Sequence, residues 1–111
     1  MFSLTEKQQK YRENKMNIQE HLLYITELAF QDLKSTPIRG VIAIWKDETA
    51  HISMYFDGTI KEEDSEAASD ACGEIAAHLP LGTMEENYIR YDSPKPLPES
   101  PFWGYKKDQL S

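Results

Sequence analysis

The chain has 111 residues, of which 40% are hydrophobic and 28% are charged, a balance typical of one globular domain with a single modest core. Its formal net charge of −7 disfavours nucleic acid as a ligand, because binding a phosphate backbone requires clustered lysine and arginine. The longest uncharged apolar run, Val41 to Trp45, is far shorter than the roughly 20 residues of a membrane span, so we expect no membrane insertion and a cytoplasmic location.

The clearest helical pattern covers residues 17–34, after a polar segment of residues 1–15. Asn17 followed three residues later by Glu20 is typical of a capping box at a helix N-terminus. Pro37 ends the helical pattern, because the residue before a proline is pushed out of helical geometry. Apolar residues recur at spacings of three and four at Ile18, Leu22, Ile25, Ala29 and Leu33.

Two strand patterns follow. Residues 38–46 are apolar on both faces and rich in β-branched side chains, which favours a central strand. Residues 49–57 alternate between polar and apolar side chains, which predicts a half-buried antiparallel partner that ends at the turn signal Asp57-Gly58. We therefore expect a hairpin with a tight turn at Asp47 and Glu48.

A second helix is predicted over residues 64–79, with Asp64 or Ser65 as its N-cap and Pro80 as its stop. Its apolar stripe consists of small residues, which would allow close approach to a sheet. Alternation over residues 85–92 then predicts a third strand.

The last segment, residues 93–111, contains four prolines, which impose an extended, loop-like course. Three aromatic residues follow within four positions, and leaving them in water would be costly. We therefore expect this tail to fold back and dock Phe102 and Trp103 on the body of the domain.

Together these patterns predict an α+β fold in the order α-β-β-α-β, with a small antiparallel sheet packed against two helices and a docked C-terminal tail rich in proline and aromatic residues. The expected domain covers residues 16–105. Residues 1–15 are expected to form a helical or disordered extension, and residues 106–111 a frayed tail.

The negative charge is concentrated between Asp47 and Glu74, where nine carboxylates face one cation, Lys61. The stretch carries a charge of −8, so the rest of the chain sums to +1. Like charges at this density repel one another, and a basic partner would offset that cost. The polar sides of the turn, the strand and the helix start in this stretch could converge on one face, a point that the sequence leaves open.

We find no pattern that specifies a reaction. His21, His51 and His78 fall on three different predicted elements, and histidine becomes reactive or binds metal only in a shaped site. Cys72 lies among alanines on the second helix, which favours a small buried hydrophobe over a nucleophile. The acidic cluster lacks the alternating ligands and central glycine of a calcium loop. We therefore expect no enzymatic activity, no cofactor and no bound metal.

In size, acidity and element order over most of residues 16–105, the chain resembles the immunity proteins of bacterial polymorphic toxin systems, including contact-dependent growth inhibition. The resemblance implies a protein that binds and neutralises a cognate basic toxin, a nuclease domain, as a monomer or weak dimer. Its carboxylates would take the place of the phosphates that the toxin otherwise holds.

A partner surface is expected where the carboxylates meet large aromatic side chains, because tight binding needs a desolvated centre within a charged ring. Two other classes remain open: a small acidic chaperone or adaptor for a secreted effector, and a small enzyme or ligand-binding domain whose site is not recognisable. The expected partner-binding residues are Trp45, Tyr55, Asp57, Glu62, Glu63, Asp64, Glu66 and Asp70.

Overall fold

A computed structural model describes residues 17–79 and 82–107, so the expectation for residues 1–15 lies outside the described part of the chain. The described residues form two α-helices and four strands, with one turn of 3-10 helix after Phe30. In chain order the elements are α2 (Ile18–Phe30), η1 (Gln31–Leu33), β1 (Ile38–Lys46), β2 (Thr49–Phe56), α3 (Glu62–Ala77), β3 (Thr83–Arg90) and β4 (Trp103–Lys106).

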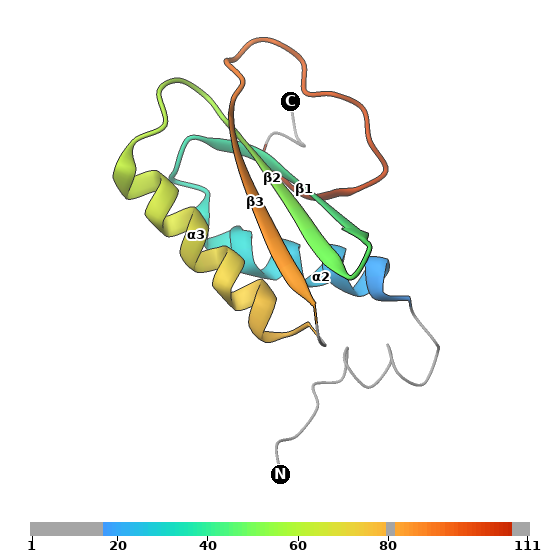
Figure 1. Ribbon diagram of the computed structural model, residues 1–111. Coiled ribbons are helices and arrows are strands. Elements are labelled where there is room, and N and C mark those ends of the chain that lie inside the picture. The colour runs from blue at the N-terminus through green and yellow to red at the C-terminus, as the bar shows by residue number, and fades with distance from the viewer. Residues whose placement is uncertain (1–16, 80–81, 108–111) are drawn as a thin grey trace.

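The strands form one sheet in the order β3-β2-β1-β4, in which the hairpin of β1 and β2 occupies the centre (Figure 1). The predicted α+β class and element order are confirmed. The sheet is mixed, however, whereas a wholly antiparallel sheet was expected: β3 runs parallel to β2 because α3 carries the chain back to the starting end of the sheet. A short fourth strand, β4, pairs antiparallel with β1 on the other side.

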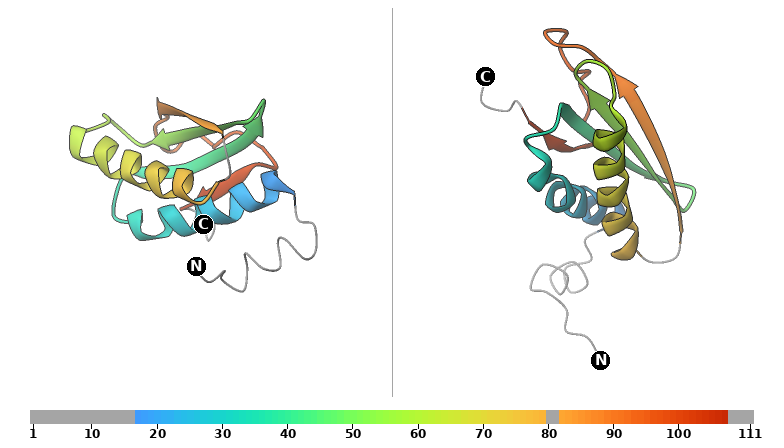
Figure 2. Two further views of the ribbon diagram at one scale, coloured as in Figure 1. Left: turned by 60° about the horizontal axis from the view of Figure 1, so that its bottom comes forward. Right: turned by 90° about the vertical axis from the view of Figure 1, so that its left-hand side faces the viewer.

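Both helices pack on one face of the sheet, and the core lies between the two layers (Figure 2). The alternation predicted for β2 is confirmed, since Ala50, Ile52, Met54 and Phe56 are fully buried against the helices. The small-residue stripe of α3 supplies Ala68, Ala71, Cys72 and Ile75 to the same core.

Helix α2 is fixed at both ends of its contact with the sheet. Its predicted capping box is present: the Asn17 side chain accepts a hydrogen bond from the Glu20 backbone N–H, and the Glu20 carboxylate accepts one from Asn17 N–H. The Gln19 side chain donates to the Ala43 carbonyl and accepts from the Trp45 N–H, which ties the first turn of α2 to β1.

Farther along α2, the helix approaches β4 so closely that only glycine fits at position 104. A Cβ atom on Gly104 would lie 2.6 Å from Cγ2 and 2.7 Å from Cβ of Thr26. Thr26 is fully buried and donates from its hydroxyl to the Leu22 carbonyl, so it has little room to move. The second half of α2 therefore holds β4 on the sheet.

Helix α3 begins two residues earlier than its sequence pattern indicated. Its N-cap is Lys61, without a side-chain capping hydrogen bond, so the prediction of Asp64 or Ser65 as N-cap is wrong. Glu62, Glu63 and Asp64 instead occupy the first turn, where carboxylates stabilise the exposed N–H groups through the helix dipole.

The C-terminal segment lies across the face of the sheet opposite the helices. Trp103 packs against Tyr55 with ring centroids 5.4 Å apart, and Tyr55 meets Tyr91 edge to face at 5.5 Å. The Trp103 indole N–H donates to the Pro98 carbonyl, and the Tyr91 hydroxyl donates to that of Pro96. The docking of Trp103 is thus confirmed, and Trp103 is also the first residue of β4.

Candidate protein-binding surface

Four carboxylates follow one another at intervals of four residues along the exposed side of α3. Each interval advances about 6 Å along the helix axis and turns by only a fraction of the circumference, so these side chains form one continuous row. We call this row the acidic ridge; its members are Glu62, Glu66, Asp70 and Glu74.

The acidic ridge is not neutralised within its own helix. Between Glu62 and Ala77 there is no lysine or arginine, and the only adjacent cation is the N-cap, Lys61. Carboxylates in the first turn benefit from the helix dipole, but Asp70 and Glu74 lie too far along α3 for that compensation. Like charges at this spacing destabilise a helix by about 0.2–0.5 kcal/mol per pair. The chain therefore carries a small stability cost along this surface.

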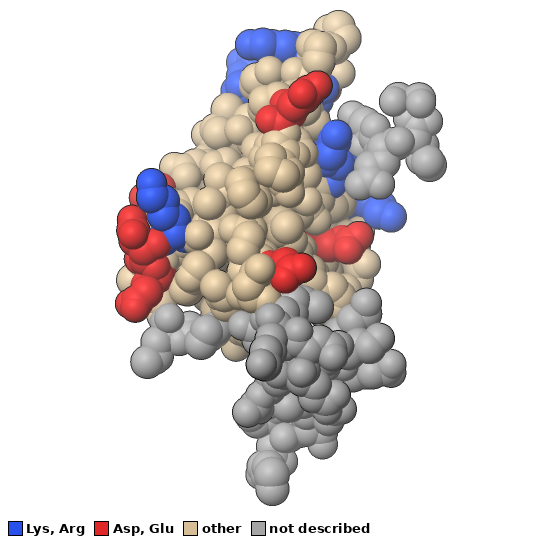
Figure 3. Space-filling view, turned by 90° about the vertical axis from the view of Figure 1, so that its right-hand side faces the viewer, with Lys and Arg blue, Asp and Glu red and all other residues tan. Residues whose placement is uncertain are grey.

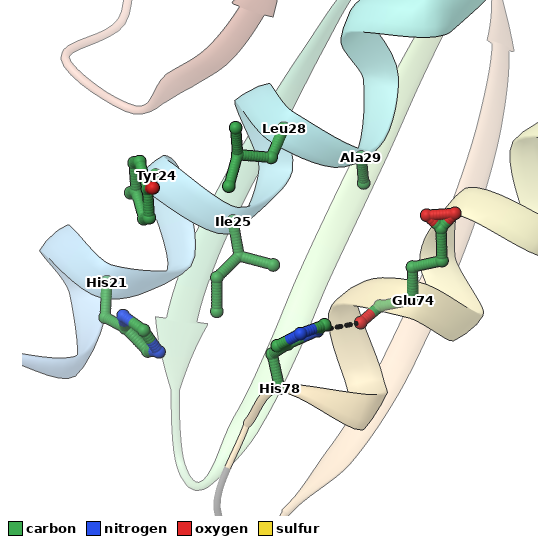
Figure 4. A pocket seen from close by; sticks show the side chains of 7 residues that line it. All are labelled: His21, Tyr24, Ile25, Leu28, Ala29, Glu74 and His78. Carbon is green, nitrogen blue, oxygen red and sulfur yellow. Dashed lines mark hydrogen bonds between the residues drawn. The ribbon is translucent and has the colours of Figure 1, made fainter. Parts of the chain in front are cut away.

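Near its C-terminal end the acidic ridge borders a groove between α2 and α3 (Figure 4). The groove has a volume of about 140 Å³. Tyr24 and Leu28 line it from α2, and Glu74 and His78 line it from α3. Leu28 is 44% exposed, the only large hydrophobic side chain among the described residues that is so open to solvent. An apolar groove beside a row of charges has the composition of a protein-binding hot spot with a polar rim.

The two histidines of the groove have structural contacts. His78 Nδ1 lies 2.9 Å from the Glu74 carbonyl oxygen, one turn back on α3. His21 is 5% exposed, and burial lowers its pKa below the ordinary value for histidine. The groove therefore has no additional positive charge from His21 at neutral pH.

Three of the expected partner-binding residues meet at the other end of α3. Asp57, Glu63 and Asp64 line a shallow depression where β2 ends and α3 begins. Lys61 and Lys107 line the same depression, so its charge is mixed. Lys107 is held there by donating from Nζ to the Thr36 carbonyl.

The two aromatic residues among the expected partner-binding residues lie in different places. Tyr55 lies on the sheet face opposite the helices, inside the aromatic cluster with Tyr91 and Trp103. Trp45 is half-buried beside Leu79 and Met84, near the C-terminal end of α3. The structure therefore groups Glu62, Glu63, Asp64, Glu66, Asp70 and Asp57 near α3 but does not bring Tyr55 to them.

The carboxylates of the whole acidic stretch do not lie on one face. Asp47 and Glu48 form the hairpin turn, where both residues have positive φ angles of 52° and 55°. Asp57 follows the opposite end of β2, about 26 Å away for an eight-residue strand. The side of the molecule away from α3 has a largely uncharged centre with acidic and basic groups near its margins (Figure 3).

Sequence reasoning missed the apolar part of this surface. The helical pattern of residues 17–34 did not single out Tyr24 or Leu28 as surface residues, and only the packing of α3 beside α2 shows that they border a groove. The four-residue spacing of the acidic ridge was visible in the sequence, and it would have indicated Glu74 as a further member.

Cys72 lies deep in the core rather than in a reactive site. Its side chain is fully buried, its Sγ lies 3.9 Å from Met54 Sδ, and burial raises the pKa of its thiol to about 12. We expect iodoacetamide to leave Cys72 unmodified at pH 8 in the folded protein and to alkylate it readily in 6 M guanidinium chloride, measured by mass spectrometry. Equal alkylation rates in the two conditions would contradict this burial.

The described residues contain no cluster of metal ligands and no helix able to span a membrane. Across residues 17–79 and 82–107, no three His, Cys, Asp or Glu side chains are grouped so that they could hold a metal ion. No helix within those ranges combines the length and the apolar character needed to cross a bilayer.

A two-layer α+β domain whose charged row and apolar groove both lie at the surface is suited to bind another macromolecule. A family model described as MafI2 immunity protein matches residues 13–108, and the chain belongs to this family. This membership supports an immunity function directed against a toxin and implies an inhibitor rather than an enzyme. No match was found among curated proteins or among solved structures.

Proposed function

We propose that this immunity protein neutralises a basic toxin domain, a nuclease, by binding it through the acidic ridge and the groove beside it. The observation that carries the proposal is the row of four carboxylates on α3 without a compensating cation in the helix. A surface that costs stability in the free protein is retained most readily when a partner of opposite charge offsets the cost.

The proposed chemistry follows from what a nuclease must bind. A nuclease domain presents cationic side chains to the phosphates of its substrate, and closely spaced phosphates resemble a row of carboxylates. Glu62, Glu66 and Asp70 would therefore occupy the substrate-binding cations. Leu28 and Tyr24 would supply the desolvated contact that makes the complex long-lived, because hot spots are centred on buried apolar and aromatic side chains.

The same mechanism would serve a system of contact-dependent growth inhibition or any other delivery route, since only the toxin domain enters the contact. An inhibitor of this kind must reach the toxin before the toxin acts. Opposite fields raise association rates well above the unsteered range of about 10⁵–10⁶ M⁻¹s⁻¹, which favours rapid capture.

The proposal predicts a steep salt dependence. We expect the association rate with the cognate toxin domain to fall strongly between about 0.01 and 0.5 M NaCl, because the Debye length shrinks from about 30 Å to a few ångströms. Stopped-flow fluorescence measures this rate directly. An association rate that does not change with salt would contradict binding through the acidic ridge.

A further inference from the structure

Strand β3 forms a free edge of the sheet. It pairs with β2 on one side, and among residues 17–79 and 82–107 no strand lies on the other. Seen from this side, β3 and α3 lie next to each other, and no other described segment covers them (Figure 2, right). The pairing of β3 with β2 runs without a register shift over eight residues, and β3 contains no proline. It therefore presents a regular edge that could accept another strand.

The hydrogen bonds of β3 show which backbone groups point outward. Thr83 N–H donates to the Glu48 carbonyl, and Tyr91 N–H donates to the Phe56 carbonyl. In a parallel pair, inward-pointing groups recur at every second residue, so the odd-numbered residues between these two also face β2. The N–H and C=O groups of the even-numbered residues must then point away from the sheet. These residues are Met84, Glu86, Tyr88 and Arg90.

The side chains of these even-numbered residues lie on the helix side of the sheet, because Tyr88 stacks on the buried ring of Phe56 with centroids 6.1 Å apart. The Tyr88 hydroxyl donates to Glu86 Oε1 over 2.6 Å, and Tyr88 also contacts Ser69 of α3. The outer edge of β3 and the adjacent side of α3 thus border the same part of the surface, which we call the corner. Glu86 contributes a carboxylate to this corner, and the acidic ridge lies on the same helix.

We propose that an extended strand of the toxin domain adds to the free edge of β3 and directs basic side chains toward Glu86 and the acidic ridge. The proposal rests on the proposed function, from which it takes the basic character of the partner. Backbone hydrogen bonds to Met84, Glu86, Tyr88 and Arg90 would supply affinity, while the carboxylates would select a cationic strand. A second copy of this chain is disfavoured as the occupant, because β3 itself carries Glu85 and Glu86.

Amide hydrogen exchange tests the pairing directly, residue by residue. In the free protein, the outward amides of Glu86 and Tyr88 should exchange much faster than the inward amides of Glu85 and Asn87. In the saturated complex with the cognate toxin domain, the outward amides should slow by at least about tenfold, because they gain backbone partners. Unchanged exchange at Glu86 and Tyr88 in that complex would overturn the proposal.

Two substitutions at position 86 distinguish the contribution of the backbone N–H to toxin binding from that of the side chain. Both Glu86→Pro and Glu86→Ala remove the carboxylate, but only proline also removes the outward N–H, which does not take part in the pairing with β2. We expect the proline variant to bind the toxin domain about tenfold or more weakly than the alanine variant. Circular dichroism and thermal unfolding establish that both variants fold. Equal affinities of two folded variants would overturn the proposal.

The outcomes distinguish this inference from the proposed function. Salt-dependent binding together with unchanged outward amides would leave the acidic ridge as the contact and reject strand addition. Slowed outward amides in a complex that is insensitive to salt would support strand addition and reject the acidic ridge. Outward amides that are already protected in the free protein, in a concentration-dependent manner, would indicate pairing of two copies and reject the toxin strand as occupant.

Discussion

The double substitution Glu66→Lys and Asp70→Lys should slow association with the toxin domain by about tenfold to a hundredfold at low ionic strength, because it reverses the middle of the acidic ridge. The folded protein should keep its stability. Each new lysine has a carboxylate four residues away, Glu62 or Glu74, so two repulsive pairs become attractive ones. Stopped-flow association rates and urea denaturation measure the two effects.

A matched variant isolates position from net charge. Glu27→Lys together with Glu99→Lys changes the formal charge by the same amount at exposed residues of α2 and of the proline-rich segment. We expect this control to associate at a rate within about threefold of the unmodified protein, since only the long-range field changes. If the control and the α3 variant slowed association equally, net charge rather than the acidic ridge would explain the binding.

Leu22→Ala should lower the free energy of unfolding by about 2–5 kcal/mol, because it empties a fully buried site in the core between the helices and the sheet. This loss is large against the roughly 5–15 kcal/mol that stabilises a typical domain. Helix α2 contacts both of these strands, so a cavity at Leu22 weakens the side of the sheet to which β4 is attached. Urea denaturation with an unchanged m-value measures the effect.

The same substitution on the same helix provides its control. Leu28→Ala removes a side chain that is 44% exposed at the groove, and we expect a loss of less than about 1 kcal/mol. Alanine raises helix propensity equally at both positions, so the difference between the variants reports burial alone. Comparable losses at Leu22 and Leu28 would show that the groove is more closed than the structure indicates.

Local patterns were sufficient to locate most elements of the fold. The capping box at Asn17 and Glu20 sets the start of α2 through hydrogen bonds three residues apart, which sequence reasoning can read directly. The alternation from Thr49 to Phe56 likewise reflects a strand with one face toward solvent and one face toward the core. The burial of β2 follows this alternation residue by residue.

Two features of the sheet were missed because they depend on contacts between distant residues. The direction of β3 relative to β2 is decided by the path of α3, and alternation within residues 83–90 is the same for a parallel or an antiparallel strand. The strand β4 contains only four residues after a run of prolines, too few for a periodic signal. Its pairing with β1 depends on the close approach of α2 at Gly104.

For the candidate surface too, some features follow from local sequence patterns and others depend on contacts between distant residues. The concentration of acidic charge between Asp47 and Glu74 can be read from the chain alone, because net charge and spacing are properties of the sequence. Which of these carboxylates lie on one side of the molecule depends on how the elements pack. The hairpin sends Asp47 and Asp57 to opposite ends of β2, whereas the four-residue periodicity of α3 keeps the acidic ridge on one side. Packing of α3 beside α2 then places that row next to Tyr24 and Leu28, a neighbourhood that no local pattern encodes.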